Sequence, residues 1–137
     1  MNHEEKKRYL KRYLAAKRKV RLLLDEIAEL RDSQTSPMGL GDGMPKGNMK
    51  SDLSGYMVKL DELLRELEAE REIQMIVYKE IRQAINAMQD ATEQEILIIR
   101  YMLGQSWEKI SAEMGYSYRH TTKKHGQALK NFEIGLP

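Results

Sequence analysis

The sequence predicts an all-α protein, with long antiparallel or oligomeric coiled-coil helices followed by a small C-terminal helix-turn-helix bundle. In two long segments, apolar residues recur at alternating steps of four and three, which is typical of a coiled coil. Near the C-terminus, a short helix, a glycine turn and a more basic helix follow one another. The expected parts are a coiled-coil helix (1–32), a Gly/Pro-rich linker (33–51), a second coiled-coil helix (52–89) and the C-terminal bundle (90–137).

Composition narrows the class of protein. The chain has 137 residues and no Cys, which excludes disulfides and thiolate metal sites within it. No apolar run is long enough to span a bilayer, and we identify no secretion signal. We therefore expect a cytoplasmic protein with no membrane partner.

Charge is distributed unevenly along the chain, although the net charge is only +2. The segment 6–21 has nine Lys or Arg and no acid, whereas 52–90 has nine acids and five bases. This asymmetry favours partners of different kinds at different faces. For the basic run three interpretations remain open: a second nucleic-acid contact, docking on an acidic face of this chain or of a polymerase, and simple solubility.

The first helix has no Gly or Pro from Asn2 to about Arg31. Leu10, Leu14 and Leu24 widen its apolar stripe. The expected seam residues are Tyr9, Tyr13, Ala16, Val20, Leu23, Ile27 and Leu30.

The segment 33–51 interrupts the pattern with Pro and Gly, which do not continue a helix. Its length is compatible with a hairpin within one chain or with helix exchange between subunits. The second helix is expected to start at Ser51 or Asp52, since both are good N-caps. Polar residues at its centre either fix register or mark the exit from the seam. Its expected seam is Leu53, Met57, Leu60, Leu64, Leu67, Arg71, Gln74, Tyr78, Ile81, Ile85 and Met88.

The C-terminal bundle is expected to open with a capping box, in which Thr92 and Glu95 satisfy free amides. The following helix, Glu93 to Leu103, is too apolar to be exposed and stops at Gly104. Its expected core residues are Ile96, Leu97, Ile98, Ile99 and Met102.

The helix-turn-helix pattern follows directly. Ser106 is expected to cap a helix from Trp107 to Met114, and Gly115 provides a left-handed turn. Ser117 then caps the second helix, whose N-terminus suits a phosphate. The inward face of this helix should comprise Thr121, His125, Ala128, Leu129 and Phe132.

The outward face of the second helix is the candidate DNA-reading surface. Arg119 can pair with guanine edges, Thr122 can touch a thymine methyl, and Lys123 can neutralise a phosphate. Whether Arg119 contacts a base or only a phosphate remains open. The full expected set is Ser117, Tyr118, Arg119, His120, Thr122, Lys123 and Lys124.

No catalytic, metal or cofactor site is expected. His3, His120 and His125 lack the spacing of a metal site, and the run 39–47 does not match a phosphate-binding loop. A non-enzymatic protein is therefore predicted.

The C-terminal pattern resembles the final helix-turn-helix domain of bacterial sigma factors, which reads the promoter minus-35 element. The pattern is Glu95-x-x-x-Ile99-Arg100-Tyr101-x-x-Gly104-x-Ser106-Trp107-x-x-Ile110-x-x-x-Met114-Gly115-Tyr116-Ser117, followed by His125-Gly126-x-Ala128-Leu129. The chain lacks the core-polymerase-binding and melting regions of sigma factors, so it could not replace one. Thr121 also stands where those domains usually have an aliphatic residue, which predicts a weaker core.

Over nearly its full length the chain resembles small phage and prophage proteins described as late-gene transcription regulators. The matching segments are Gly43-Met44-Pro45 and Ser51-Asp52-Leu53-Ser54-Gly55-Tyr56-Met57-Val58-Lys59-Leu60-Asp61-Glu62-Leu63. This resemblance implies a regulator that binds double-stranded DNA as a homo-oligomer, dimer or tetramer, with host RNA polymerase as a further candidate partner. Two alternatives remain: the DNA-recognition subunit of a phage packaging terminase, and a polymerase-binding adaptor that does not read DNA.

Overall fold

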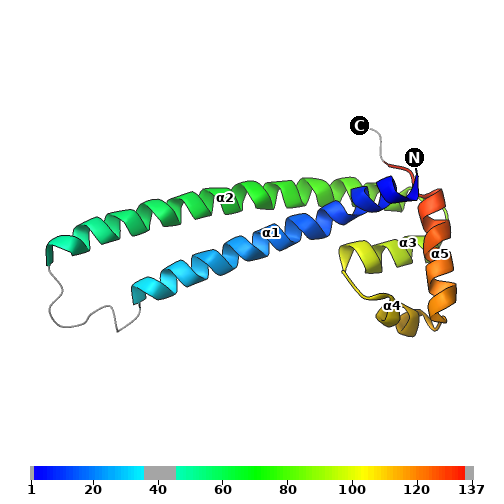
Figure 1. Cartoon of the computed structure of the whole chain (residues 1–137). Coiled ribbons are helices and arrows are strands. Elements are labelled where there is room, and N and C mark those ends of the chain that lie inside the picture. The colour runs from blue at the N-terminus through cyan, green and yellow to red at the C-terminus, as the bar shows by residue number, and fades with distance from the viewer. Residues whose placement is uncertain (1, 36–45, 135–137) are drawn as a thin grey trace. The chain divides into compact units, whose positions relative to one another are not determined.

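The computed structural model describes the backbone of residues 2–35 and 46–134, and the side chains of 2–34 and 53–134. These residues form helices and short connections with no strand among them, which confirms the all-α class (Figure 1). The helices are α1 (His3–Thr35), α2 (Lys46–Asn86), α3 (Ala91–Leu97), the π-helical turn η2 (Ile98–Met102), α4 (Trp107–Met114) and α5 (Tyr118–Asn131).

The segment predicted as a linker, 33–51, is shorter than expected on both sides. Helix α1 continues to Thr35, and α2 begins at Lys46 rather than at Ser51 or Asp52. The predicted start was wrong because a good N-cap residue also fits inside a helix when its side chain is not needed as a cap. Residues 36–45 of the predicted linker lie outside the described residues.

Contacts divide the chain into two compact units that do not follow chain order. The terminal unit comprises Met1–Ala16 and Gln74–Pro137, and the middle unit comprises Lys17–Ile73. Helices α1 and α2 each contribute residues to both units. The first turns of α1 therefore pack with the C-terminal helices, a grouping that the predicted division along the chain does not contain.

The terminal unit has a continuous apolar core. Leu10 of α1, Ile81 and Ile85 of α2, and Phe132 after α5 are all 0% exposed. The ring of Tyr9 lies 6.0 Å from that of Phe132, and Tyr13 meets Tyr78 edge-on at 5.4 Å. Tyr9 and Tyr13 are thus core-packing residues, as predicted. The remaining buried members of the cluster are Val77, Ala84, Leu97, Tyr101, Met102, Ala128 and Leu129.

The start of α3 differs from the predicted capping box. Asp90, not Thr92, is the N-cap, and its carboxylate accepts from the backbone amides of Thr92 and Glu93. Because the helix starts two residues earlier than predicted, the amide of Gln94 already donates to the Asp90 carbonyl, and the Thr92 hydroxyl is not required as a cap. The Gln94 side chain instead reaches the end of α2, where its amide donates to the carbonyls of Ile85 and Met88.

The predicted core helix from Glu93 to Leu103 is present but changes its winding. After Leu97 the chain forms η2, in which the Leu103 amide donates to the Ile98 carbonyl at 3.0 Å. Such π turns insert an extra residue and rotate the side chains that follow. Gly104 ends the segment with φ 70°, as expected for a C-terminal glycine. Ile96, Leu97, Ile99 and Met102 are buried, which confirms their assignment to the core, and Ile98 packs partly buried against it.

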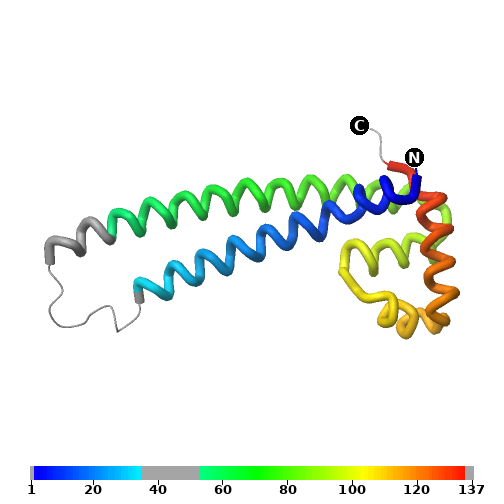
Figure 2. The backbone as a smooth tube through the Cα atoms, in the orientation of Figure 1, coloured from blue at the N-terminus to red at the C-terminus, as the bar shows by residue number. Residues whose placement is uncertain are grey.

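In the middle unit, α1 and α2 lie side by side and run in opposite directions (Figure 2). Val20, Leu23 and Ile27 pack against Leu67, with Leu60 and Leu63 at the edge. Lys19 Nζ also lies 3.7 Å from a carboxylate oxygen of Glu70. Among the side chains that the structure describes, the buried contact between the two helices in this unit is one narrow stripe.

The predicted seam of α2 is right at some positions and wrong at others. The predicted positions that are buried or half-buried, as expected, are Leu60, Leu67, Gln74, Ile81, Ile85 and Met88. The predicted positions that are exposed are Leu53, Met57, Leu64, Arg71 and Tyr78. At the last three of these, the neighbour one residue earlier is buried or half-buried instead: Leu63, Glu70 and Val77.

This correction has a simple cause. Leu63 and Leu64, like Val77 and Tyr78, are adjacent apolar residues, so periodicity alone fits either one. Glu70 was overlooked because a carboxylate seldom faces another helix without a partner, which Lys19 supplies here.

Candidate nucleic-acid interface

Helix α4 begins and ends at the predicted residues, and α5 begins directly after its predicted cap, Ser117. The Ser106 hydroxyl accepts from the Lys109 amide at 3.2 Å, and Gly115 ends α4 in the left-handed region with φ 70°. The Ser117 hydroxyl then accepts from the His120 amide at 3.1 Å and caps α5. Both caps and the glycine turn are confirmed, because each serine accepts from the amide three residues on and the glycine adopts the left-handed conformation.

The inward face of α5 is also confirmed. Thr121, His125, Ala128, Leu129 and Phe132 are all buried, at 8% exposure or less. Their spacing of three and four places them on one side of the helix, against α3, η2 and α4. The opposite side of α5 is consequently fixed toward solvent.

Thr121 is completely buried, yet its hydroxyl is satisfied. The Ser111 hydroxyl of α4 donates to the Thr121 oxygen at 2.9 Å, and Thr121 donates to the Ser117 carbonyl at 2.9 Å. This chain of hydrogen bonds links α4, the turn and α5. A Thr at this position therefore joins the two helices through polar contacts, where an aliphatic residue would join them by packing alone.

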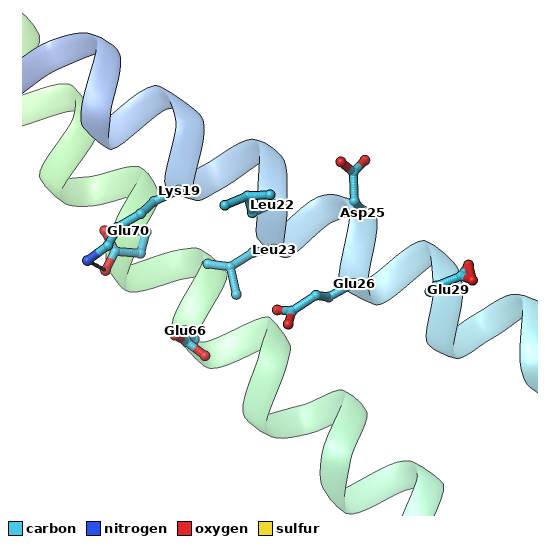
Figure 3. Close-up of a pocket in the computed structure, with 8 residues that line it drawn as sticks. All are labelled: Lys19, Leu22, Leu23, Asp25, Glu26, Glu29, Glu66 and Glu70. Carbon is cyan, nitrogen blue, oxygen red and sulfur yellow. Dashed lines mark ion pairs between the residues drawn. The ribbon is translucent and has the colours of Figure 1, made fainter.

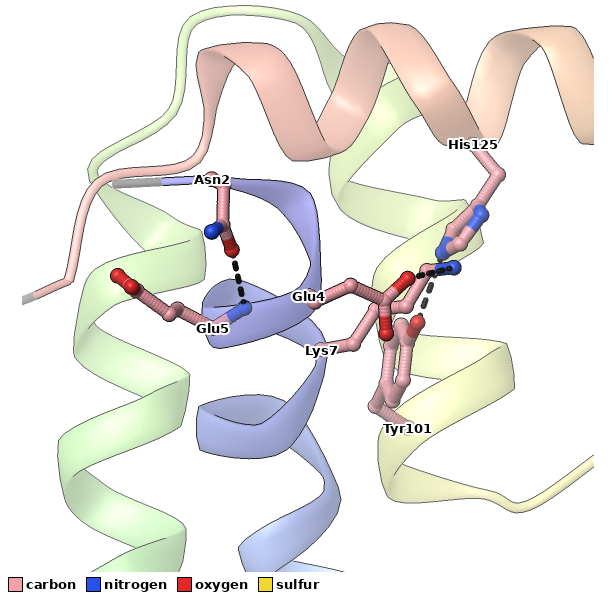
Figure 4. Close-up of polar contacts among 6 residues, drawn as sticks. All are labelled: Asn2, Glu4, Glu5, Lys7, Tyr101 and His125. Carbon is pink, nitrogen blue, oxygen red and sulfur yellow. Dashed lines mark hydrogen bonds and ion pairs between the residues drawn. The ribbon is translucent and has the colours of Figure 1, made fainter.

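His125 is a packing histidine, as predicted. Its Nε2 lies 2.8 Å from the Tyr101 hydroxyl of η2 (Figure 4). Its ring packs on that of Trp107, with 4.5 Å between the ring centroids. Burial, with Lys7 and Arg100 nearby, lowers the pKa of His125 from 6.5 to about 4. Burial raises the pKa of Tyr101 to about 12. Both side chains are therefore neutral at pH 7, which a buried hydrogen-bonded pair requires.

The outward face of α5 places the predicted reading residues together. Tyr118, Arg119, His120 and Lys123 are exposed on the first two turns, beside the exposed cap Ser117. Thr122 and Lys124 are half-buried at the two margins of this face. Within the described part of the chain, Arg119 and Lys123 take part in no ion pair, so both cations are available to an anion.

The ring of Tyr116 holds His120 edge-on at 4.5 Å. The Thr122 hydroxyl donates to the Arg119 carbonyl at 3.0 Å, so its methyl group is the part free for an apolar contact. We call the seven residues of the predicted set, from Ser117 to Lys124, the α5 face.

The basic run of α1 contributes to the same unit. The Lys6 ammonium donates to the carbonyls of Leu129 and Lys130, at 2.8 and 3.3 Å, and so caps the last turn of α5. Arg12 pairs with Glu80 at 2.8 Å and lies over the ring of Tyr9. Lys6 and Arg12 therefore bind other parts of the fold. Composition alone could not separate these two cations from the other Lys and Arg residues of the run.

Beside the α5 face lies a hollow of about 290 Å³ that sequence reasoning missed. It is lined by Lys7 and Lys11 of α1, Arg100 of η2, Trp107 of α4, and Thr122, with Tyr101 and His125. Figure 4 shows Lys7, Tyr101 and His125 converging there from three different helices. One signal was available in the sequence: Arg100 stands alone within an otherwise apolar run.

The middle unit presents the opposite charge. A groove there is lined by Leu22, Leu23 and five carboxylates, with Lys19 as its single cation (Figure 3). Those acids are Asp25, Glu26, Glu29, Glu66 and Glu70. No cluster of His, Cys, Asp or Glu in the described residues has the arrangement of a metal site. Among the helices described, none is long and apolar enough to cross a membrane.

Comparisons with protein-family models, with curated proteins and with solved structures found no match to this chain. The α5 face and the charges around it are therefore the features that indicate a function.

Proposed function

We propose that this protein is a sequence-specific DNA-binding regulator of phage or prophage transcription, which reads double-stranded DNA with the α5 face. The observation that supports it most is the division of α5 into two sides. One side is buried in the core and fixes the orientation of the helix, while the other exposes Arg119 and Lys123, which form no ion pair with the described residues. A rigidly held basic helix after a glycine turn is the element that helix-turn-helix proteins insert into the major groove.

Each residue of the α5 face has a role in this proposal. Arg119 donates to the edge of a guanine or to a phosphate, and Lys123 neutralises a phosphate one turn later. Ser117 and the first amides of α5 approach the backbone, since the N-terminus of a helix favours an anion. Tyr118, Thr122 and the flanking His120 and Lys124 complete the contact area.

The proposal includes self-association through the middle unit. Leu22 on α1, and Leu53, Met57 and Val58 on α2, are each more than half exposed. Leu53, Met57 and Val58 lie within two turns of α2, and exposed apolar residues that lie together mark sites of association between proteins. A single small reading module buries little DNA surface, and linking two modules raises the effective concentration of the second. We therefore infer a coiled-coil homo-oligomer, a dimer or tetramer, that pairs its α5 faces.

The central test is binding of labelled prophage promoter fragments at fixed salt. Relative to wild type, the double variant Arg119→Ala with Lys123→Ala should bind at least about tenfold more weakly, because each good base contact is worth about 1–3 kcal/mol. The matched control is Lys59→Ala with Lys79→Ala, which removes two exposed cations from α2. Equal affinity of wild type and the α5 variant, or no binding by wild type at low salt, would contradict the proposal.

The same assay separates the two roles left open for Arg119. If Arg119 contacts a base, Arg119→Ala should narrow the difference in affinity between preferred and scrambled fragments. If it contacts only a phosphate, binding to both should weaken by the same factor.

Association is tested by native mass spectrometry of the full chain. The variant Leu53→Gln with Met57→Gln should shift the assembly toward monomer, whereas Leu103→Gln, at an equally exposed leucine of the terminal unit, should not. A ring of about eight or more subunits would instead favour the terminase alternative. Co-purification with host RNA polymerase that survives loss of Arg119 and Lys123 would favour the adaptor that does not read DNA.

A further inference from the structure

The hollow beside α5 has an unusual set of charges. Three cations line it, Lys7, Lys11 and Arg100, and no carboxylate does. Among these three cations, Lys7 has an ion pair, with a carboxylate oxygen of Glu4 at 3.3 Å from its Nζ. The Glu4 side chain is 77% exposed. A gathering of like charges is unfavourable by itself, so it is stabilised when an anion occupies the space between them.

The walls of the hollow keep Arg100 in place. The Arg100 guanidinium lies over the Trp107 ring at 4.5 Å and donates to the Gln105 carbonyl at 3.0 Å. Trp107 in turn packs on His125, which is held by Tyr101. A guanidinium stacked on an indole still has several N–H donors free for an oxygen ligand.

The position of the hollow identifies the source of the anion. Thr122 belongs both to its lining and to the α5 face, next to Lys123 and one turn from Arg119. A duplex that contacts Arg119 and Lys123 therefore has a backbone phosphate within reach of the same helix. We infer that Lys7, Lys11 and Arg100 form a phosphate site that holds a backbone phosphate of the DNA bound by α5. This inference rests on the proposed function.

The site also assigns roles within the basic run, which the sequence left open. Lys6 and Arg12 hold the fold through Leu129, Lys130 and Glu80, whereas Lys7 and Lys11 face the hollow. The first turns of α1 would thus extend the DNA contact beyond α5.

The test measures how DNA affinity of the full chain depends on salt. Each lost phosphate contact should lower the slope of log Kd against log salt concentration by about one, because fewer counterions are released. We expect this change, with about three- to tenfold weaker binding, for Lys7→Gln and for Lys11→Gln. Lys79→Gln removes the same charge from an exposed position of α2 outside the hollow and should leave the slope unchanged. Thermal melting confirms that each variant is folded.

The single tryptophan provides a second readout, because Trp107 lines the hollow. DNA should change its fluorescence in wild type and in Lys79→Gln, and less in Lys11→Gln. Inorganic phosphate, compared with chloride at matched ionic strength, tests the site without DNA. The fluorescence change should again be larger in wild type and in Lys79→Gln than in Lys11→Gln.

The outcomes separate this inference from the proposed function. If Arg119→Ala weakens binding while Lys7→Gln and Lys11→Gln match wild type in slope and affinity, the phosphate site is wrong and DNA reading stands. If wild type binds no duplex, the proposed function fails and so does the assignment to a DNA phosphate. A Trp107 response to inorganic phosphate that Lys11→Gln abolishes would then support an anion site for free phosphate alone.

Discussion

The terminal and middle units are built partly from the same two helices, yet they bury side chains to very different extents. In the terminal unit, parts of α1 and α2 are covered by α3, η2 and α5, and residues such as Leu10 and Ile81 reach 0% exposure. In the described part of the middle unit, α1 and α2 pack only against each other, and four residues form the buried cluster. A pair of helices can cover one stripe on each partner, and full burial needs a third element.

Charge follows the same division. The terminal unit has thirteen Lys or Arg and nine Asp or Glu, whereas the middle unit has ten and twelve. The unit with the more complete core also carries the excess of positive charge and the α5 face. This pairing fits the proposal, because a reading helix must be held rigidly and must attract phosphates. The thinly packed acidic unit suits contact with protein.

The largest effect should come from truncating the core of the terminal unit. Leu10→Ala should lower the free energy of unfolding by about 3 kcal/mol or more, because it leaves a cavity among helices that cannot all collapse into it. Leu23→Ala, at 6% exposure in the middle unit, should cost less, since its surroundings are open to solvent on several sides. Urea denaturation measures both, and Leu103→Ala, at 59% exposure, is the control. Equal losses for Leu10 and Leu23 would contradict the contrast between the units.

The element that covers Leu10 could not be predicted from the sequence. The heptad pattern of α1 correctly predicted a buried stripe, but periodicity does not identify which element covers each position. The caps at Ser106 and Ser117 and the turn at Gly115 were predictable because each depends on residues close in sequence. The hollow was not, since Lys7, Arg100 and Thr122 come from three distant segments.

Low pH should destabilise the terminal unit through His125. Its pKa is about 4 in the folded protein and 6.5 in the unfolded chain, so between these values the unfolded chain binds the extra proton. The stabilisation by neutral His125 is therefore complete above pH 6.5 and is lost as the pH falls toward 4. The shift corresponds to roughly 3 kcal/mol.

The comparison needed is wild type against His125→Gln, which keeps a hydrogen-bonding group for Tyr101 but does not titrate. Urea denaturation from pH 7.5 to 4 should show a steeper loss of stability in wild type. The unfolding signal should come from Trp107, which reports on the terminal unit. Parallel pH profiles for the two proteins would exclude His125 as the titrating group.

A smaller loss should follow from removing the cap that α1 places on α5. Lys6→Gln should lower the free energy of unfolding by about 1–2 kcal/mol, because the carbonyls of Leu129 and Lys130 lose a charged donor at the end of a helix. Lys11→Gln removes the same charge from an exposed position with no such bond and should change stability by less than about 0.5 kcal/mol. If both variants lose stability equally, net charge and not the cap is responsible.

The smallest expected effect is a gain in the free energy of unfolding. It comes from replacing one helical glycine by alanine in each unit, so that the two units can be compared. Gly126 in α5 and Gly55 in α2 are helical, and a Cβ added at either meets no atom within 4 Å. Alanine should therefore improve helix propensity at both, by at most about 1 kcal/mol. At Gly126 the full gain should appear in the free energy of unfolding, because α5 folds with the core around it. At Gly55 much of it should be missing, since α2 there has few buried contacts and can open locally without unfolding the rest. Denaturation followed by circular dichroism, with hydrogen exchange at the two helices, would show whether the units differ in this way.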